Sequence, residues 1–100
     1  MSQGTRLKDR VAIVTGAARG IGHAIATRFA AEGARVYLAD KRAELVRESA
    51  GAIAEKHAGT AFAQTVDIAD RELVRAMVAA TLKRWGRLDI LVNNAALPEP

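Results

Sequence analysis

The chain has 100 residues, half of them hydrophobic, with 15 lysines and arginines against 11 acidic residues and a formal net charge of +4. This length fits one small domain, and the absence of cysteine excludes a disulfide framework and thiol chemistry. The basic residues are not interleaved with the aromatic ones, which fall at hydrophobic positions of predicted elements, so the composition argues against nucleic-acid binding.

The N-terminal residues 1–8 contain no hydrophobic core of the kind that a signal peptide has. No hydrophobic run in the chain approaches the roughly 20 residues of a transmembrane helix. The absence of cysteine agrees with a reducing compartment. These features together predict a cytoplasmic protein with no membrane contact.

A short hydrophobic strand is predicted near residues 10–15, and it leads directly into the sequence TGAARGIG at residues 15–22. Hydrophobic residues then recur at helical spacing at Ile21, Ile25 and Phe29. A strand, a glycine turn and a helix N-terminus together form a cradle for a phosphate group, because backbone N–H groups and the positive end of the helix dipole face the anion.

Each glycine of this turn has its own predicted role. Gly16 allows the chain to leave the strand in a tight turn, since glycine adopts positive φ values at little cost. Gly20 leaves room for a pyrophosphate beside the start of the helix, and Gly22 lets the helix lie close to the strand. The spacing differs from the G-x-G-x-x-G fingerprint and from the phosphate loop that ends in Gly-Lys-Ser/Thr. A glycine turn that holds no ligand is the alternative interpretation.

The second predicted strand, near residues 35–39, is followed by Asp40. An acidic residue about 20 residues after the glycines is the usual partner of the adenosine ribose hydroxyls. Its carboxylate would repel a 2′-phosphate, so Asp40 favours NAD over NADP. The nearby basic residues Arg19, Lys41 and Arg42 argue in the opposite direction, and we give them less weight because the carboxylate lies closer to the ribose. Asp40 can alternatively act as the N-cap of the next helix.

Two further strands are predicted near residues 61–66 and 89–93, each preceded by a helix. The middle helix, from about Lys41 to His57, has a weak hydrophobic pattern, whereas the third helix has a continuous hydrophobic face and the capping residue Asp70. The helices are expected to end at Gly33, Gly59 and Gly86. This alternation predicts an α/β fold, the N-terminal half of a Rossmann-type doubly wound parallel sheet, β-α-β-α-β-α-β, with strand order 3-2-1-4.

The threonine, the three glycines and their spacing at residues 15–22 resemble the cofactor motif T-G-x-x-x-G-[IL]-G of the short-chain dehydrogenase/reductase family. The resemblance implies the cofactor-binding part of an oxidoreductase that transfers hydride between a nicotinamide cofactor and an alcohol or ketone. It also implies that Asp67 and Ile68, after the third strand, contact the adenine. Asp67 can instead form an Asx turn before the third helix.

A second family motif, N-N-A-G, is similar to the sequence NNAA at residues 93–96. In the family the first asparagine ties the central strand to its neighbours, and the second lies beside the nicotinamide ribose. Ala96 replaces the glycine and adds a methyl group where the backbone passes close to the cofactor. The resemblance implies a cofactor site made of Thr15, Gly16, Arg19, Gly20, Ile21, Gly22, Asp40, Asp67, Ile68, Asn94, Ala95 and Ala96.

The catalytic residues of the family, a Tyr-x-x-x-Lys pair on a helix with a serine before it, normally follow the N-N-A-G segment. Tyr37 and Lys41 match the spacing, but Tyr37 lies on a predicted strand, where residues four apart are separated by about 13 Å. Tyr37 is therefore predicted to be a core residue. We predict no catalytic residue in this chain and expect a single NAD-binding half-domain, residues 1–100, truncated before the catalytic segment and inactive alone.

No spacing typical of metal ligands is found, because His23 and His57 each stand alone on a predicted helix. The parent enzyme is expected to use NAD, to act on a small alcohol or ketone and to form a homo-oligomer, with no nucleic-acid or membrane partner. Two alternatives remain open. One is a stand-alone dinucleotide-binding or sensing module without catalysis, and the other is a basic interaction protein that has lost the ligand.

Overall fold

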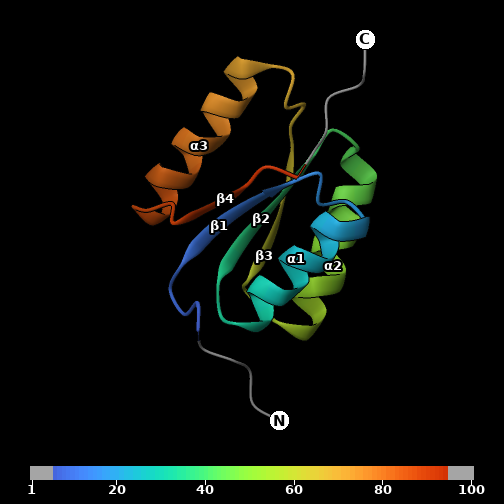
Figure 1. Cartoon of the computed structure of the whole chain (residues 1–100), viewed down its shortest axis with the longest axis vertical. Helices are drawn as coiled ribbons and strands as arrows, with labels where there is room; N and C mark the ends of the chain where they lie inside the picture. The colour runs from blue at the N-terminus through green and yellow to red at the C-terminus, as the bar shows by residue number, and fades with distance from the viewer. Residues whose placement is uncertain (1–5, 95–100) are drawn as a thin grey trace.

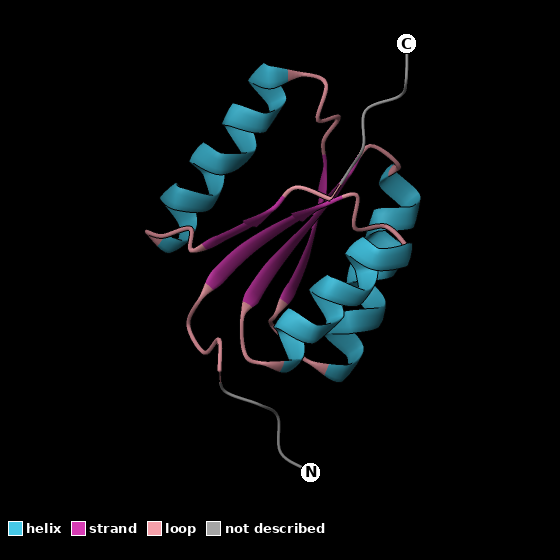
Figure 2. Cartoon of the chain, viewed as in Figure 1, coloured by secondary structure: helices cyan, strands magenta, loops and turns pink. Residues whose placement is uncertain are grey.

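The computed structural model describes residues 6–94, which form four strands and three helices in strict alternation. The elements in chain order are β1 (Val11–Thr15), α1 (Gly20–Ala31), β2 (Arg35–Asp40), α2 (Ala43–Lys56), β3 (Ala61–Thr65), α3 (Arg71–Trp85) and β4 (Ile90–Val92). All pairs of neighbouring strands are parallel, and the sheet order is β3-β2-β1-β4. Helices α1 and α2 lie on one face of the sheet and α3 on the other (Figures 1 and 2). The predicted α/β class, element order and strand order are confirmed.

Several element boundaries differ from the prediction. Helix α2 begins at Ala43, because the two residues before it form the turn out of β2, and β4 has only three residues. Gly86 ends α3 directly, with a left-handed φ of 74° and its N–H donating to the carbonyl of Leu82. Gly33 and Gly59 also have positive φ values, but they lie in the turns beyond the last residues of α1 and α2.

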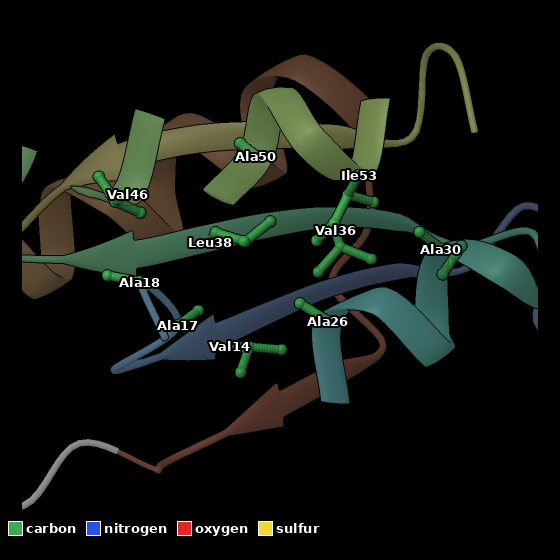
Figure 3. Close-up of a cluster of buried hydrophobic side chains, with 11 residues drawn as sticks. Val14, Ala17, Ala18, Ala26, Ala30, Val36, Leu38, Val46, Ala50 and Ile53 are labelled. Carbon is green, nitrogen blue, oxygen red and sulfur yellow. The ribbon is translucent and has the colours of Figure 1, made fainter. Parts of the chain in front are cut away.

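Side chains alternate between the two faces of the strands, as the pleat requires, and both faces of the central strands are buried. On the first face, Val14 of β1 and Val36 and Leu38 of β2 pack against α1 and α2 (Figure 3). Helix α1 contributes only alanine to the fully buried part of this core, Ala26 and Ala30, so its backbone lies close to the sheet.

The opposite face packs Val11, Ile13 and Tyr37 against Met77 of α3. The Tyr37 hydroxyl accepts a hydrogen bond of 2.6 Å from the indole Nε1 of Trp85. Its ring stacks on Phe62 with ring centres 5.2 Å apart. Tyr37 is therefore a buried strand residue with its polar atom already paired, and the predicted core role is confirmed.

Asp70 caps α3 as predicted. Its Oδ1 atom accepts hydrogen bonds from the backbone N–H groups of Glu72 at 3.0 Å and Leu73 at 3.2 Å. Two of the N–H groups that a helix start leaves without an intrahelical partner are thereby satisfied. Among residues 6–94, no helix has the length and hydrophobicity needed to cross a membrane.

Candidate functional site

The turn between β1 and α1 lies at the carboxyl end of the central strands, beside the end of β2. Gly16 has φ 62° and Gly20 has φ 67°, values in the left-handed region that glycine adopts at the least cost. For Gly16 this confirms the expected tight turn. The sequence predicted a glycine at residue 20 because a pyrophosphate needs room beside the helix. The positive φ of Gly20 is a second reason for glycine at this position, which the sequence did not indicate.

Gly20 and Gly22 have opposite surroundings, although they are two residues apart. A Cβ atom built on Gly20 meets no atom within 4 Å, so its position faces open space at the start of α1. A Cβ atom on Gly22 would lie 2.3 Å from the Gly16 carbonyl oxygen and 2.7 Å from Asn94 Nδ2. Gly22 is therefore required for contact between the helix and the turn itself, a closer constraint than the predicted packing of the helix on the strand.

The first turn of α1 has no acidic residue, and its N-cap residue Arg19, in an extended conformation, makes no capping hydrogen bond through its side chain. The first N–H groups of a helix point along the axis out of its N-terminus, together with the positive end of its dipole. Arg19, Gly20 and Ile21 are all exposed at this end, and Ile21 exposes 73% of its surface. The arrangement suits an anionic group placed at the start of α1.

Hydrogen bonds from both neighbouring strands fix the turn in place. The N–H of Ala17 donates to the carbonyl of Ala39 at 3.3 Å, at the end of β2. The N–H of Ala18 donates to Asp40 Oδ2 at 3.3 Å. On the β4 side, Asn94 Nδ2 donates to the Gly16 carbonyl at 3.3 Å. The turn is thus preorganised, with its inward polar groups already paired.

Asp40 is buried, with 5% of its surface exposed, and its carboxylate is fully engaged. Oδ1 accepts from the N–H of Arg42 at 3.0 Å and from the Arg42 Nε at 2.9 Å. Oδ2 accepts from Ala18 at 3.3 Å and from the Arg42 Nη2 at 2.8 Å. The hydrogen bonds from Arg42 lower the pKa of Asp40 from its ordinary 3.8 to about 2, although burial acts to raise it. Asp40 is therefore ionised at neutral pH.

Asp40 does not cap α2. The N-cap position belongs to Arg42, whose side chain makes no capping bond, and Asp40 instead accepts the Arg42 N–H in the turn before the helix. The alternative N-cap interpretation is thus not what the structure shows. The Arg42 guanidinium, which sequence reasoning placed only in the vicinity, contacts both carboxylate oxygens.

Thr15 and the two asparagines join β1 to β4. The Thr15 hydroxyl lies 3.3 Å from the Val92 carbonyl and 3.4 Å from Asn93 Oδ1, and it accepts the N–H of Asn94 at 3.0 Å. Asn94 also contacts Gly16 through its side chain. Tying the strands together, a role that the family resemblance assigns to the first asparagine, is therefore shared with Asn94 and Thr15.

Asp67 and Ile68 follow β3, the edge strand, and no contact joins them to the turn at residues 16–19 among the interactions of the described residues. Asp67 Oδ1 accepts the N–H of Ala69 at 3.0 Å, which is the Asx turn of the alternative interpretation. Asp67 is exposed and Ile68 is half-buried, so a ligand can reach both. Ala95 and Ala96 lie outside the described residues.

Sequence reasoning missed one polar contact at this site. Ser49 of α2 is buried, its hydroxyl donates to the Ala17 carbonyl at 3.0 Å, and it also contacts His23 Nδ1 of α1. The available signal was a serine on the buried face of α2, at helical spacing from Val46 and Ile53. Within residues 6–94, no three acidic or histidine side chains gather as they would around a metal ion.

Comparison with known proteins gives consistent matches along the chain. Residues 10–100 match the family described as short chain dehydrogenase. A sorbitol dehydrogenase of Cereibacter sphaeroides is 46% identical over 92 residues, which are 92% of this chain and 34% of that protein. The chain thus spans about a third of the length of this curated relative.

Solved structures agree with the sequence match. A short chain dehydrogenase from Mycobacterium smegmatis superposes with a TM-score of 0.87 at 37% identity, covering 97% of this chain and 41% of that one. L-Sorbose reductase from Gluconobacter frateurii, complexed with NADPH and L-sorbose, superposes with a TM-score of 0.85 at 37% identity, covering 99% and 37% of the two chains.

Proposed function

Because the chain belongs to the short-chain dehydrogenase family, we propose that its glycine turn and Asp40 bind the adenosine and pyrophosphate half of a nicotinamide dinucleotide. The parent protein is an NAD(P)-dependent oxidoreductase. When bound, the nicotinamide supplies or accepts hydride. The residues described here bind and orient that cofactor, and residues 1–100 act as one cofactor-binding half-domain.

The observation that carries this proposal is the hydrogen bond from the Ala18 N–H to Asp40. It joins the two parts of the site that a dinucleotide needs, a phosphate cradle at the start of α1 and a carboxylate for the ribose, at the carboxyl ends of the two central strands. The open space beside Gly20 supports the fit, since a phosphate group needs room next to the helix N-terminus.

We propose that the remaining residues of the site follow the family pattern. Thr15, Gly16 and Gly22 shape the turn, while Arg19, Gly20 and Ile21 face the pyrophosphate. Asp67 and Ile68 border the adenine, and Asn94, Ala95 and Ala96 approach the nicotinamide ribose. The exposure of Arg19, Ile21 and Asp67 and the Asn94–Gly16 contact support these assignments.

Asp40 favours NAD over NADP, but Arg42 determines how readily the ribose reaches it. An ionised carboxylate offers about four acceptor positions, and Asp40 accepts four hydrogen bonds, three of them from Arg42. The two bonds from the guanidinium must break before ribose hydroxyls can donate there. The Arg42 side chain is 37% exposed, so it has a direct path to solvent. Once released, its charge can also lie near a 2′-phosphate.

Fluorescence titration of the protein with NADH and NADPH tests the proposal. We expect both to bind and NADH to bind more tightly. Arg42→Ala is expected to strengthen NADH binding and weaken NADPH binding, because it frees the carboxylate and removes the cation. Tighter NADPH binding by the unmutated protein would overturn the NAD preference, and binding of neither would overturn the function.

For the parent enzyme, we propose a small alcohol or ketone as the substrate and a homo-oligomer as the assembly. Relatives named for sorbitol and L-sorbose support the substrate class. We place the catalytic tyrosine, lysine and serine outside this chain. Tyr37, the one tyrosine of the chain, is buried, and its hydroxyl is hydrogen-bonded to Trp85. An activity screen over an alcohol and ketone panel, with NAD and NADH respectively, tests this assignment.

A further inference from the structure

A serine and a histidine connect both helices of one face of the sheet to the glycine turn. Ser49 of α2 donates its hydroxyl proton to the Ala17 carbonyl at 3.0 Å, and its oxygen also contacts Nδ1 of His23 on α1. Ser49 exposes 6% of its surface, and Ala17 is fully buried. Neither polar side chain takes part in the cofactor contacts proposed above.

The number of protons available decides which group donates in the hydrogen bonds of Ser49 with Ala17 and His23. A carbonyl oxygen can only accept, so the single hydroxyl proton of Ser49 is committed to Ala17. His23 Nδ1 must then carry a proton and donate it to the Ser49 oxygen. The chain of donors runs from His23 to Ser49 to the carbonyl of Ala17. The imidazole thereby holds the hydroxyl in the one orientation that serves the turn.

The bond to Ala17 acts on the same peptide unit as Asp40. A peptide group is planar and trans, with its C=O and N–H pointing in opposite directions. The carbonyl of Ala17 is held by Ser49, and the N–H of Ala18, in the same peptide group, is held by Asp40 at 3.3 Å. This group is therefore clamped from both sides, by α2 and by the end of β2. The N–H groups of Arg19 and Gly20 follow directly along the chain, so a rotation of this peptide group would displace them.

We propose that Ser49 is a positioning residue for dinucleotide binding, oriented by His23, and that it acts by fixing the Ala17–Ala18 peptide group. The inference rests on the proposed function of the turn. The loss of one hydrogen bond to a buried carbonyl is expected to weaken dinucleotide binding by about tenfold. The role is one of positioning, since neither side chain needs to contact the cofactor.

The test compares Ser49→Ala with Thr81→Val in the protein. Thr81 is a matched control, because it is also a buried helical hydroxyl that donates to a backbone carbonyl, that of Met77, on the opposite face of the sheet. Both variants lose one buried hydroxyl. We expect only Ser49→Ala to weaken NADH binding, by about tenfold, with Thr81→Val remaining within about twofold of the unmutated protein. Equal affinities in the two variants would refute the positioning role.

Two variants of His23 separate the effect of its hydrogen-bond donor from the effect of its side-chain volume. In His23→Asn, the Nδ2 amide is bonded to Cγ, as Nδ1 is in histidine, and can donate to Ser49 from the same place. His23→Leu fills the space without a donor. Retained binding in His23→Asn and weakened binding in His23→Leu are expected. If the two histidine variants bind equally, His23 does not orient Ser49.

A measurement without cofactor distinguishes this inference from the proposed function. Hydrogen exchange at the Ala18 N–H reports the clamped peptide group directly, and we expect it to be about tenfold faster in Ser49→Ala than in Thr81→Val at matched stability. Unchanged exchange would overturn the clamp even in a protein that binds NADH. Faster exchange in a protein that binds no dinucleotide would support the clamp and reject the proposed function.

Discussion

The centre of the sheet and its β4 edge differ in how completely they are buried. In β1 and β2, every residue except Arg35 is buried, and the Ala17–Ala18 peptide group of the glycine turn is hydrogen-bonded on both sides. At β4, no residue is fully buried, and Leu91 exposes 55% of its surface. Helix α3 exposes Leu73 and Leu82 at 45% and 46%. The proposed dinucleotide site thus lies at the well-buried centre of the sheet, whereas β4 and α3 leave hydrophobic side chains exposed.

The largest effect is expected at Gly22, where the turn meets α1. Gly22→Ala would place a Cβ atom 2.3 Å from the Gly16 carbonyl oxygen, a contact that a backbone atom cannot relieve cheaply. We expect a loss of about 3 kcal/mol or more in the free energy of unfolding, measured by urea denaturation.

Gly51→Ala is the matched control for this substitution. Gly51 lies within α2, and a Cβ atom there meets nothing within 4 Å. Alanine has the higher helix propensity, so this variant is expected to gain about 0.5 to 1 kcal/mol. Similar stabilities of the two variants would show that the turn is not packed as tightly as the structure indicates.

The next effect is on binding, at Gly20. Gly20→Ala introduces a methyl group into the space proposed for the pyrophosphate, and also strain of about 1 kcal/mol at its positive φ. We expect a stable fold with NADH affinity lowered by about 100-fold or more, equivalent to roughly 2.7 kcal/mol.

Gly59→Ala isolates the strain from the binding effect. Gly59 has φ 78° and equally open surroundings, but it lies in the turn after α2. It should lose similar stability and keep its NADH affinity. If Gly20→Ala binds NADH as well as Gly59→Ala does, the phosphate cradle is wrongly assigned.

A moderate effect is expected at the carboxylate of Asp40. Its pKa is lowered to about 2 in the folded protein, so its contribution is present above the unfolded value near 3.8 and is lost as pH falls toward 2. Asp40→Asn should lower the free energy of unfolding at pH 7 by about 1 to 2 kcal/mol, and by almost nothing near pH 2. Urea denaturation at both pH values checks this.

Asp89, directly before β4, provides the comparison at the less buried edge of the sheet. Its pKa is also lowered to about 2, chiefly by the hydrogen bond from Arg87, and it holds the N–H of Val11 at 2.9 Å. Its side chain is more exposed than that of Asp40, 18% against 4%. Asp89→Asn is expected to show the same direction of pH dependence with a smaller amplitude. A larger amplitude than for Asp40→Asn would contradict the difference drawn between the two regions.

The smallest effect on stability is expected at Leu91. Since its side chain is already more than half exposed, Leu91→Lys should change the free energy of unfolding by no more than about 0.5 kcal/mol.

The 100-residue chain made alone should self-associate through β4 and show no dehydrogenase activity. Light scattering should report a lower mass for Leu91→Lys. A monomeric unmutated chain that reduces NAD would contradict both expectations.

The sequence alone predicted the fold and located the glycine turn, because both depend on local patterns. Short hydrophobic runs and helical repeats set the strand and helix order, and the spacing of Gly16, Gly20 and Gly22 located the turn. The hydrophobic run before Asp40 likewise predicted that this residue comes at the end of a strand. Even the rejection of Tyr37 as a catalytic residue required only the geometry of a strand.

The tertiary structure alone decided which groups the site residues contact. Ser49 and Ala17 are 32 residues apart, and Asn94 and Gly16 are 78 apart, so no periodicity links them. Arg42 is a near neighbour of Asp40 in the sequence, yet the two hydrogen bonds from its guanidinium to the carboxylate depend on how the chain turns before α2. Hydrophobic spacing specifies which side of an element is buried, whereas the pairing of a polar atom depends on which other elements pack against it.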